Sequence, residues 1–294
     1  MRKQTYFNQK FVALLLIAPQ LVITLIFFIW PAAYALKQSF YRSDAWGLHS
    51  QFVGLTNFFN LFSSHDYLNA IGVTLVFSVC VALLALIVGL LMAALVNGVN
   101  RGAGVYKTLL IWPYAVAPAI AGILWRFLLN PAIGTLSYVL HYFGVNWDYT
   151  IHPRQALTLV ILASAWQQFS YNFLFFLAGL HAIPKAYIEA AALDGAGPLA
   201  RFRHIVLPLL SPTTFFLLVI NLIYAFFDTF GVIQVVTQGG PAEATNTLVF
   251  KVYSDGFIGL DLGGSATQSV ILMLVVIVLT IIQFRYIERK VHYA

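Results

Sequence analysis

Charged residues are scarce in this chain of 294 residues: Asp, Glu, Lys and Arg together make up 9%, against 61% hydrophobic residues. Soluble globular domains carry about 25% charged residues, so the composition excludes an ordinary soluble domain. What the chain has instead is a series of apolar runs of roughly 20 residues, the length that crosses the hydrocarbon layer of a bilayer. The sequence therefore predicts a membrane protein.

Cysteine and familiar catalytic motifs are also lacking. The single Cys80 excludes a disulfide within one chain. No Gly-x-x-x-x-Gly-Lys-Ser/Thr phosphate loop occurs, so we expect no ATP hydrolysis by this chain. The seven histidines show no His-x-x-x-His pair, which argues against a membrane metalloprotease. The sequence thus predicts no catalytic and no metal-binding residues.

Six apolar runs are each long enough to span a bilayer, some with tilt. They are Phe11–Trp30, Ala70–Val96, Thr108–Leu128, Ala156–Leu180, Thr213–Ile233 and Gly264–Phe284. Within them only Arg126 and Asp228 are ionisable, both towards the outer ends. Secondary transporters usually carry such groups near the midplane, so this scarcity implies an external energy source. The predicted fold class is an all-α membrane protein with about six transmembrane helices.

Lys and Arg residues are unevenly distributed between the two sides of this arrangement. Eleven of the 16 lie on the side of the termini and five on the other side. By the positive-inside bias, both termini and the loop 181–212 are predicted to be cytoplasmic. The net charge of +6 then reflects topology and predicts no nucleic-acid partner. The first run is longer than the roughly 7–15 apolar residues of a signal peptide, so we expect an uncleaved helix.

The loop between the fourth and fifth runs predicts two short helices. Pro184 suits the first turn of a helix, Ala190–Ala192 propagate it, and Gly195 can take the left-handed conformation that ends it. Pro208 and Pro212 then mark re-entry into the membrane. A small-surfaced helical loop on the cytoplasmic side offers a surface against which another protein could dock.

The loop also contains a longer pattern, formed by Glu189, Ala190, Ala191, Asp194, Gly195, Ala196, Phe202, Ile205, Leu207, Pro208 and Pro212. With this pattern it resembles the EAA loop of ABC importer permeases. The resemblance implies that the first six of these residues belong to a coupling helix, which sits in a groove of a cytoplasmic ATPase subunit. An amphipathic loop helix resting on the bilayer is the alternative, but it does not account for a glycine and two prolines at these spacings.

The resemblance covers about the whole chain and implies the type I ABC importer permease fold. Segments similar to the maltose-type permease group are Phe52–Phe58, Trp112–Pro118, Asn130-Pro131 and Gly239–Pro241. Segments similar to permeases of sn-glycerol-3-phosphate importers are Ser170–Phe176, Asn221–Phe230 and Phe284–Tyr293. The implied organisation is an N-terminal transmembrane helix and first periplasmic loop at 1–69, a transmembrane domain at 70–284 and a cytoplasmic tail at 285–294.

The family also implies the partners and the function. The partners are a homologous second permease, two copies of an ABC ATPase that uses ATP and Mg²⁺, a periplasmic substrate-binding protein, and the lipid of the bacterial inner membrane. The expected function is import of sn-glycerol-3-phosphate or related glycerophosphodiesters, with this chain as a non-enzymatic permease subunit. The alternatives are a permease for a neutral sugar or oligosaccharide, and a membrane structural or signalling subunit without a solute path.

Polar residues on two of the runs are candidates for lining a solute path. At helical spacing they form two sets, Gln168, Tyr171 and Asn172 on the fourth run and Asn221, Tyr224 and Asp228 on the fifth. Interhelical hydrogen bonding is the alternative for both sets. No Lys or Arg lies near mid-membrane to meet a phosphate, so helix N-termini, the second permease or the receptor would supply that recognition.

Two prolines interrupt the third run. Pro113 and Pro118 cannot donate backbone hydrogen bonds, and they free carbonyl groups that neighbours or water must satisfy. The pattern is typical both of a moving hinge and of a static kink filled by packing.

Overall fold

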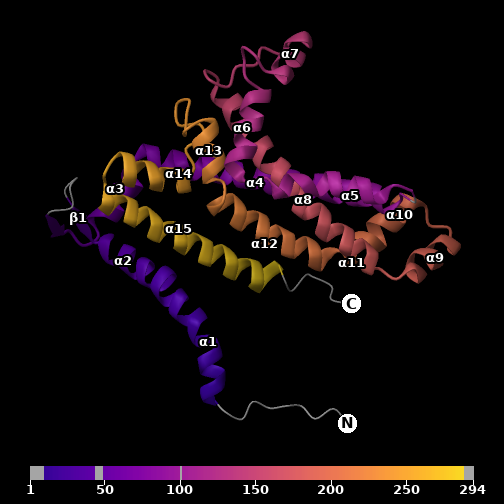
Figure 1. Cartoon of the computed structure of the whole chain (residues 1–294), viewed down its shortest axis with the longest axis horizontal. Helices are drawn as coiled ribbons and strands as arrows, with labels where there is room; N and C mark the ends of the chain where they lie inside the picture. Colours follow the sequence, from indigo (N-terminus) through magenta and orange to yellow (C-terminus); the bar gives the residue numbers. More distant parts are fainter. Residues whose placement is uncertain (1–9, 44–48, 100, 288–294) are drawn as a thin grey trace. The chain divides into compact units, whose positions relative to one another are not determined.

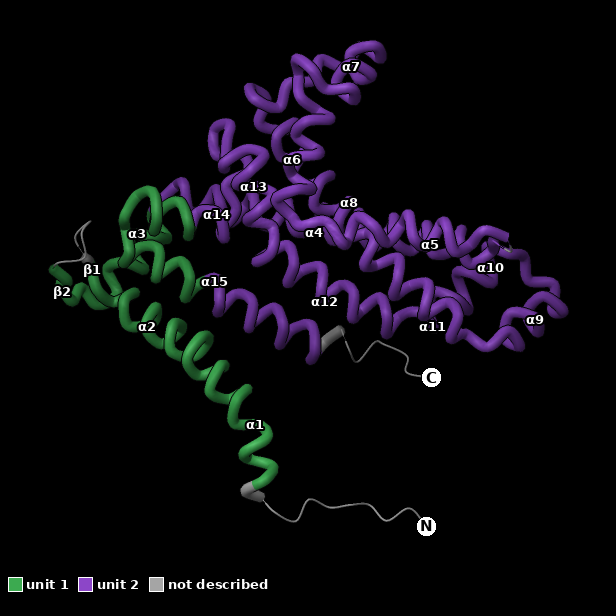
Figure 2. The backbone as a smooth tube through the Cα atoms, in the orientation of Figure 1, with its two compact units in different colours: residues 1–63, 252–271 green, residues 64–251, 272–294 purple. Residues whose placement is uncertain are grey.

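The computed structural model describes residues 10–43, 49–99 and 101–287, and in this part of the chain the helices are joined by turns and loops and accompanied by one two-stranded ribbon (Figure 1). The outermost residues of both predicted cytoplasmic ends, 1–9 and 288–294, lie outside the described residues. Two compact units are distinguished, residues 1–63 with 252–271 and residues 64–251 with 272–294 (Figure 2). The predicted division at residues 69 and 284 follows membrane topology instead, and it stays a prediction.

The first unit begins with a long apolar helix. Its parts follow one another without a break: α1 (Lys10–Thr24), a π-helical turn (Leu25–Ile29) and α2 (Trp30–Gln38). The segment Val12–Gln38 is long and apolar enough to cross a membrane, and its most apolar stretch is not buried inside the protein. An apolar helix left uncovered needs lipid or another protein around it. The predicted first span is therefore helical and continues beyond Trp30.

The first unit contains a short two-stranded ribbon, which is held by side-chain hydrogen bonds. The sequence analysis did not predict this ribbon. The remaining elements of this unit are β1 (Tyr41–Ser43), antiparallel β2 (Ser50–Phe52), α3 (Thr56–Ser63), a π-helical turn (Ser254–Ile258) and the first half of α15 (Leu262–Ile282). Asn57 Nδ2 donates to the carbonyls of Ser39 and Tyr41 at 2.9 and 3.0 Å. Thr267 on α15 donates to the same Ser39 carbonyl at 3.2 Å. Backbone groups at the end of α2 are thus satisfied by side chains.

The second unit packs around two long helices. Its elements are α4 (His65–Asn97), α5 (Ala103–Ile111), a 3₁₀ turn (Trp112–Ala115), α6 (Pro118–Leu128), α7 (Thr135–Tyr142), α8 (Pro153–Ala182), α9 (Lys185–Leu193), α10 (Pro198–Arg201), a π-helical turn (Phe202–Val206), α11 (Leu207–Leu209), α12 (Ser211–Phe227), α13 (Phe230–Val236), most of α14 (Leu248–Tyr253), the second half of α15 and a π-helical turn (Gln283–Ile287). α4 packs most extensively against α8, and α12 packs against both. Phe77 on α4 and Phe173 on α8 are completely buried in this core.

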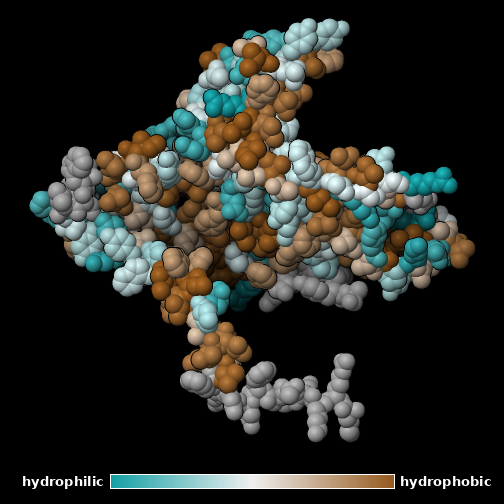
Figure 3. All heavy atoms as spheres, viewed as in Figure 1, coloured by the Kyte–Doolittle hydropathy of each residue, from teal (hydrophilic) through white to brown (hydrophobic). Residues whose placement is uncertain are grey.

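The described helices fit the predicted membrane class. Val12–Gln38, His65–Asn97 and Leu262–Arg285 are each long and apolar enough to cross a membrane alone. Three further helix pairs meet the same criterion together but are bent, which gives up to six spans if each pair is one span. Hydrophobic residues cover wide areas of the visible surface (Figure 3), as lipid-facing helices require. The all-α membrane class is confirmed, and the six-span count holds only with the bent pairs included.

The third predicted span, Thr108–Leu128, is not one continuous helix. The helical stretch ending at Ala115 and α6 meet at an angle of 103°. Val116 and Ala117 between them have extended backbone, with ψ of 129° and 141°. Pro118 disfavours a helical conformation at the residue before it and has no N–H to continue the helix. The predicted proline interruption is confirmed as a sharp break, and whether it moves stays a prediction.

The fifth predicted span, Thr213–Ile233, is also interrupted. α12 ends at Phe227 and α13 begins at Phe230. The Thr229 hydroxyl donates to the Ala225 carbonyl at 3.1 Å, a side-chain bond that competes with the helical backbone ladder. Asp228 therefore lies at the C-terminal end of α12 and not inside a continuous span.

Candidate functional site

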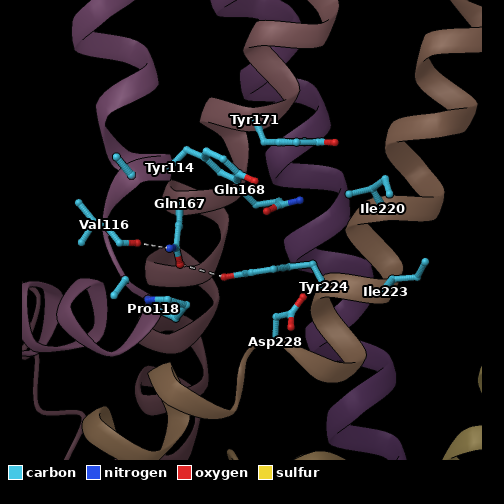
Figure 4. Close-up of a pocket in the computed structure, with 12 residues that line it drawn as sticks. Tyr114, Val116, Pro118, Gln167, Gln168, Tyr171, Ile220, Ile223, Tyr224 and Asp228 are labelled. Carbon is cyan, nitrogen blue, oxygen red and sulfur yellow. Dashed lines mark hydrogen bonds between the residues drawn. The ribbon is translucent and has the colours of Figure 1, made fainter. Parts of the chain in front are cut away.

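The break in the third span lies beside a cavity of about 620 Å³. The lining comes from the break, from α8 and from the second half of α12: Tyr114, Ala115, Val116, Ala117, Pro118, Gln167, Gln168, Tyr171, Ile220, Ile223, Tyr224 and Asp228 (Figure 4). In membrane proteins, non-helical backbone within a span is tolerated where it is buried or lines a cavity. The cavity and the broken helix are therefore parts of one feature.

Gln167 holds the broken backbone in place. Its Nε2 donates to the Val116 carbonyl, and its Oε1 accepts from the Tyr224 hydroxyl at 3.2 Å (Figure 4). A continuous helix would bond the Val116 carbonyl to an N–H four residues onward, and here a side chain from α8 replaces that donor. Gln167 is only 5% exposed, and these two hydrogen bonds satisfy both the nitrogen and the oxygen of its buried amide.

Four of the six predicted path residues line the cavity, namely Gln168, Tyr171, Tyr224 and Asp228. Gln168 is 3% exposed and points into the cavity beside Tyr171 (Figure 4). Among the described residues, none forms a hydrogen bond with its side-chain amide. The ring of Tyr171 lies 5.2 Å from that of Tyr114, measured between centroids. One wall of the cavity therefore carries aromatic rings and an amide that opens on the cavity without a hydrogen-bond partner among the described residues.

The other two predicted path residues, Asn172 and Asn221, are not among the lining residues. Asn172 Nδ2 donates to Asn221 Oδ1 at 3.0 Å, and Asn221 Nδ2 donates to Asn172 Oδ1 at 2.9 Å. Both side chains are completely buried where α8 meets α12. For this pair the structure supports the alternative considered from the sequence, interhelical hydrogen bonding.

The amide pair should show non-additive behaviour when it is replaced by leucine. Asn172→Leu or Asn221→Leu alone leaves one buried amide without its partner, at a cost of about 1–3 kcal/mol. The double variant leaves neither, so its loss of stability should be smaller than the sum of the two single losses. Unfolding midpoints of the four proteins in one detergent measure this. Additive losses would show that the two amides are not energetically coupled.

The charges near the cavity are of one sign. Asp228 is the only carboxylate in the lining, which contains no Lys, Arg or His. Arg126 is engaged elsewhere: its Nη1 donates to the Val235 carbonyl in the last turn of α13 at 2.8 Å. A basic side chain there complements the partial negative charge of a helix C-terminus. The cavity therefore presents amide, hydroxyl and carboxylate groups without a fixed cation.

The loop after α8 has the predicted helix, turn and second helix, in α9 and α10. α9 ends in a Schellman turn, in which the Ala196 N–H donates to the Ala191 carbonyl at 2.9 Å and the Gly195 N–H to the Ala192 carbonyl at 3.1 Å. Gly195 has φ of +81°, which confirms the predicted left-handed glycine. Bonds of this kind fix the angle at which the chain leaves α9.

The predicted coupling residues lie on an accessible surface. Of these, Glu189, Ala190, Asp194 and Gly195 are exposed, and Ala191 and Ala196 are half-buried. Leu193 and Leu199, 90% and 79% exposed, flank the turn. Exposed leucines beside small residues form an apolar surface that another protein could cover. The geometry is compatible with docking, and the coupling role itself stays a prediction.

The sequence reasoning missed two polar lining residues, Gln167 and Tyr114. Gln167 lies four residues before Tyr171, so helical spacing offered a signal for it, but its bond to the Val116 carbonyl depends on the broken third span. Tyr114 follows Pro113 directly, so a signal for it existed: side chains beside a proline break in a span lie next to non-helical backbone.

Comparison with known sequences identifies the family and several similar proteins. The sequence profile of the family described as binding-protein-dependent transport system inner membrane component matches residues 85–293. The sn-glycerol-3-phosphate transport system permease protein UgpA of Agrobacterium fabrum is 58% identical over 98% of each chain. The protein of the same name from Yersinia pestis bv. Antiqua (strain Antiqua) is 57% identical over 98% of this chain and 97% of its own.

Solved structures show the same fold. A chain of a bacterial ABC transporter involved in the import of the acidic polysaccharide alginate matches with a TM-score of 0.81, at 22% identity over 95% of this chain and 96% of its own. The alginate transporter in complex with an alginate pentasaccharide-bound periplasmic protein matches with a TM-score of 0.79, at 22% identity over 93% of each chain. These likenesses confirm the predicted permease fold.

Proposed function

Because this chain belongs to the family of binding-protein-dependent transport system inner membrane components, we propose that it is the permease subunit of an ATP-driven importer of sn-glycerol-3-phosphate. The assignment of this substrate is supported by 57–58% identity, over almost the full length, to permeases named for this compound. The chain is a translocation subunit of the inner membrane and not an enzyme.

The proposed complex contains a homologous second permease, two copies of an ABC ATPase and a periplasmic substrate-binding protein. A fold neighbour solved with a periplasmic protein supports partners of this kind. ATP and Mg²⁺ would bind the ATPase, on which the segment 189–196 would dock. α10, α11 and α12 follow α9 in the chain with short connections, so a displacement of α9 would reach Tyr224 and Asp228 in the cavity wall.

A neutral sugar or oligosaccharide is the second candidate substrate, and the cavity itself favours it. The lining combines tyrosine rings, amides and a carboxylate without a cation. Such a set suits hydroxyl groups, whereas a phosphate is usually met by Arg, Lys or a helix N-terminus. The two candidates therefore differ in a property that a transport assay measures directly.

Reconstitution tests the proposed function. Proteoliposomes that contain this chain, its second permease, the ATPase and the receptor should take up radiolabelled sn-glycerol-3-phosphate only with internal ATP and receptor present, and maltose-like sugars poorly. Isothermal titration of the purified receptor provides an independent measurement of the ligand. A receptor that binds a neutral sugar and ignores glycerol phosphate would favour the second candidate. An ATPase that never co-purifies with this chain would favour a structural or signalling subunit.

Cysteine labelling tests the proposed topology, with both termini and the loop 181–212 cytoplasmic. Pro198→Cys, at the exposed start of α10, should react with a membrane-impermeant maleimide only after the cells are opened, because the loop would face the cytoplasm. Phe59→Cys, exposed on α3 in the predicted first periplasmic loop, should react in intact spheroplasts. Labelling of Pro198→Cys from the periplasm would reverse the topology.

A further inference from the structure

Some polar side chains at and behind the cavity already bond one another within the protein. Gln167 bonds the Val116 carbonyl and the Tyr224 hydroxyl, and the two asparagines behind it bond each other. In the described part of the chain, the lining side chains without a hydrogen-bond partner include the amide of Gln168 and the carboxylate of Asp228. A ligand in the cavity therefore meets one amide and one carboxylate that are free to bind it, together with the hydroxyls of Tyr114 and Tyr171.

The fixed charges of the cavity disfavour a phosphate. α6 begins at Pro118 in the lining, and its N-terminus carries about half a positive charge. α12 ends next to Asp228, and its C-terminus carries about half a negative charge, so the two helix ends roughly cancel. The carboxylate of Asp228 then gives the cavity a net negative charge. A phosphate dianion placed here would be repelled, and no cation in the lining offsets that repulsion.

The same groups suit a polyol. A carboxylate accepts hydrogen bonds from hydroxyl groups, and an amide both donates to a hydroxyl and accepts from one. The face of Tyr171, in the same lining, can cover the C–H surface between the hydroxyls. The Gln168 amide opens on the cavity and has no hydrogen-bond partner among the described residues, so a ligand hydroxyl can bond it.

From these observations we infer that this chain binds the glycerol hydroxyls of its substrate through Gln168 and Asp228, while the phosphate group points away from the cavity. The inference rests on the proposed function and adds which part of the substrate the cavity contacts. The phosphate then faces the second permease subunit, which must supply positive charge. This chain then recognises the glycerol end of the substrate, and the second permease recognises the phosphate end.

Three probes separate the two ends of the substrate in proteoliposomes of the complete complex. sn-Glycerol-3-phosphate carries both ends, and glycerophosphocholine keeps the glycerol but caps the phosphate. The third probe, 3-hydroxypropyl phosphate, keeps the phosphate and lacks the middle hydroxyl. Uptake is measured with the receptor saturated by each probe, as confirmed by titration. Failure of the wild type to import glycerol phosphate would refute the proposed function, and the inference with it.

Asp228→Asn should lower uptake of the two glycerol-bearing probes by the same factor, about tenfold, because both present the same hydroxyls. Gln168→Leu should lower them similarly and reduce the preference for glycerol phosphate over 3-hydroxypropyl phosphate by about tenfold. Ile223→Ala is the matched control in the same lining, and it should leave all ratios between probes unchanged. Co-purification of the ATPase and receptor-stimulated ATP hydrolysis verify assembly of each variant.

The opposite pattern would overturn the inference. If the cavity held the phosphate, Asp228→Asn would remove a repulsive charge and raise uptake of glycerol phosphate relative to glycerophosphocholine. An unchanged preference for glycerol phosphate over 3-hydroxypropyl phosphate in Gln168→Leu would equally contradict it. Gln168→Leu carries the test alone if Asp228→Asn does not assemble.

Discussion

Gly89→Leu is expected to prevent α4 from packing against α8 and to reduce the yield of folded protein by tenfold or more. A Cβ at this position would lie 2.6 Å from the Asn172 Cβ, 3.0 Å from the Phe173 backbone nitrogen and 3.1 Å from the Phe169 carbonyl oxygen. Two of these three atoms are backbone, so no change of rotamer relieves the overlap. Overpacking in a well-packed core costs about 1–3 kcal/mol, and about 1.4 kcal/mol corresponds to a factor of ten.

The same helix provides the control for this prediction. Gly72→Leu introduces the same side chain on α4, where nothing lies within 4 Å of the new Cβ. It should leave the yield unchanged or raise it slightly, because leucine favours a helix over glycine by roughly 0.5–1 kcal/mol. The measurement is the monodisperse fraction in size-exclusion chromatography after extraction in mild detergent. Equal yields from the two variants would show that α4 and α8 do not approach as closely as described.

Gly195→Val is expected to lower transport at least tenfold while the protein still inserts and folds. The turn after α9 requires φ of +81° at this residue, a conformation that costs a non-glycine residue about 1–2 kcal/mol and a β-branched residue more. There is open space around the position, so the change acts through the backbone and not through a clash. Gly195→Asp would strain the turn less because Asp tolerates this conformation, and it would act mainly through charge.

Gly197→Val is the matched control, two residues further along the same exposed loop. Gly197 has φ of −67° and ψ of 164°, which valine adopts readily, and its surroundings are equally open. Uptake and co-purification of the ATPase should fall at least tenfold in Gly195→Val and remain near wild type in Gly197→Val. If both variants transport normally, the turn is not part of the coupling surface. If both fail alike, the loop is sensitive to side-chain bulk in general, and the argument from φ is wrong.

Local chemistry explains why the loop after α8 was predictable from the sequence. A helix that starts at a proline, continues through alanines and ends at a glycine is specified by residues within one segment, and α9 and its Schellman turn match that expectation. The break in the third span was indicated for the same reason, because Pro118 acts on its own backbone. The β1–β2 ribbon was missed because it depends on Asn57, which bonds carbonyl groups 16 and 18 residues away in the chain.

The sequence by itself determined that the chain lies in a membrane, which segments are long enough to span it, where the third span breaks and how the loop after α8 turns. Helical spacing also placed Gln168, Tyr171 and Asn172 on one side of α8. Only the tertiary structure decided that Gln168 opens on a cavity while Asn172 meets Asn221. Periodicity fixes the angle of a side chain around its own helix, whereas the neighbour at that angle depends on which second helix packs there, and for Asn172 that helix is α12.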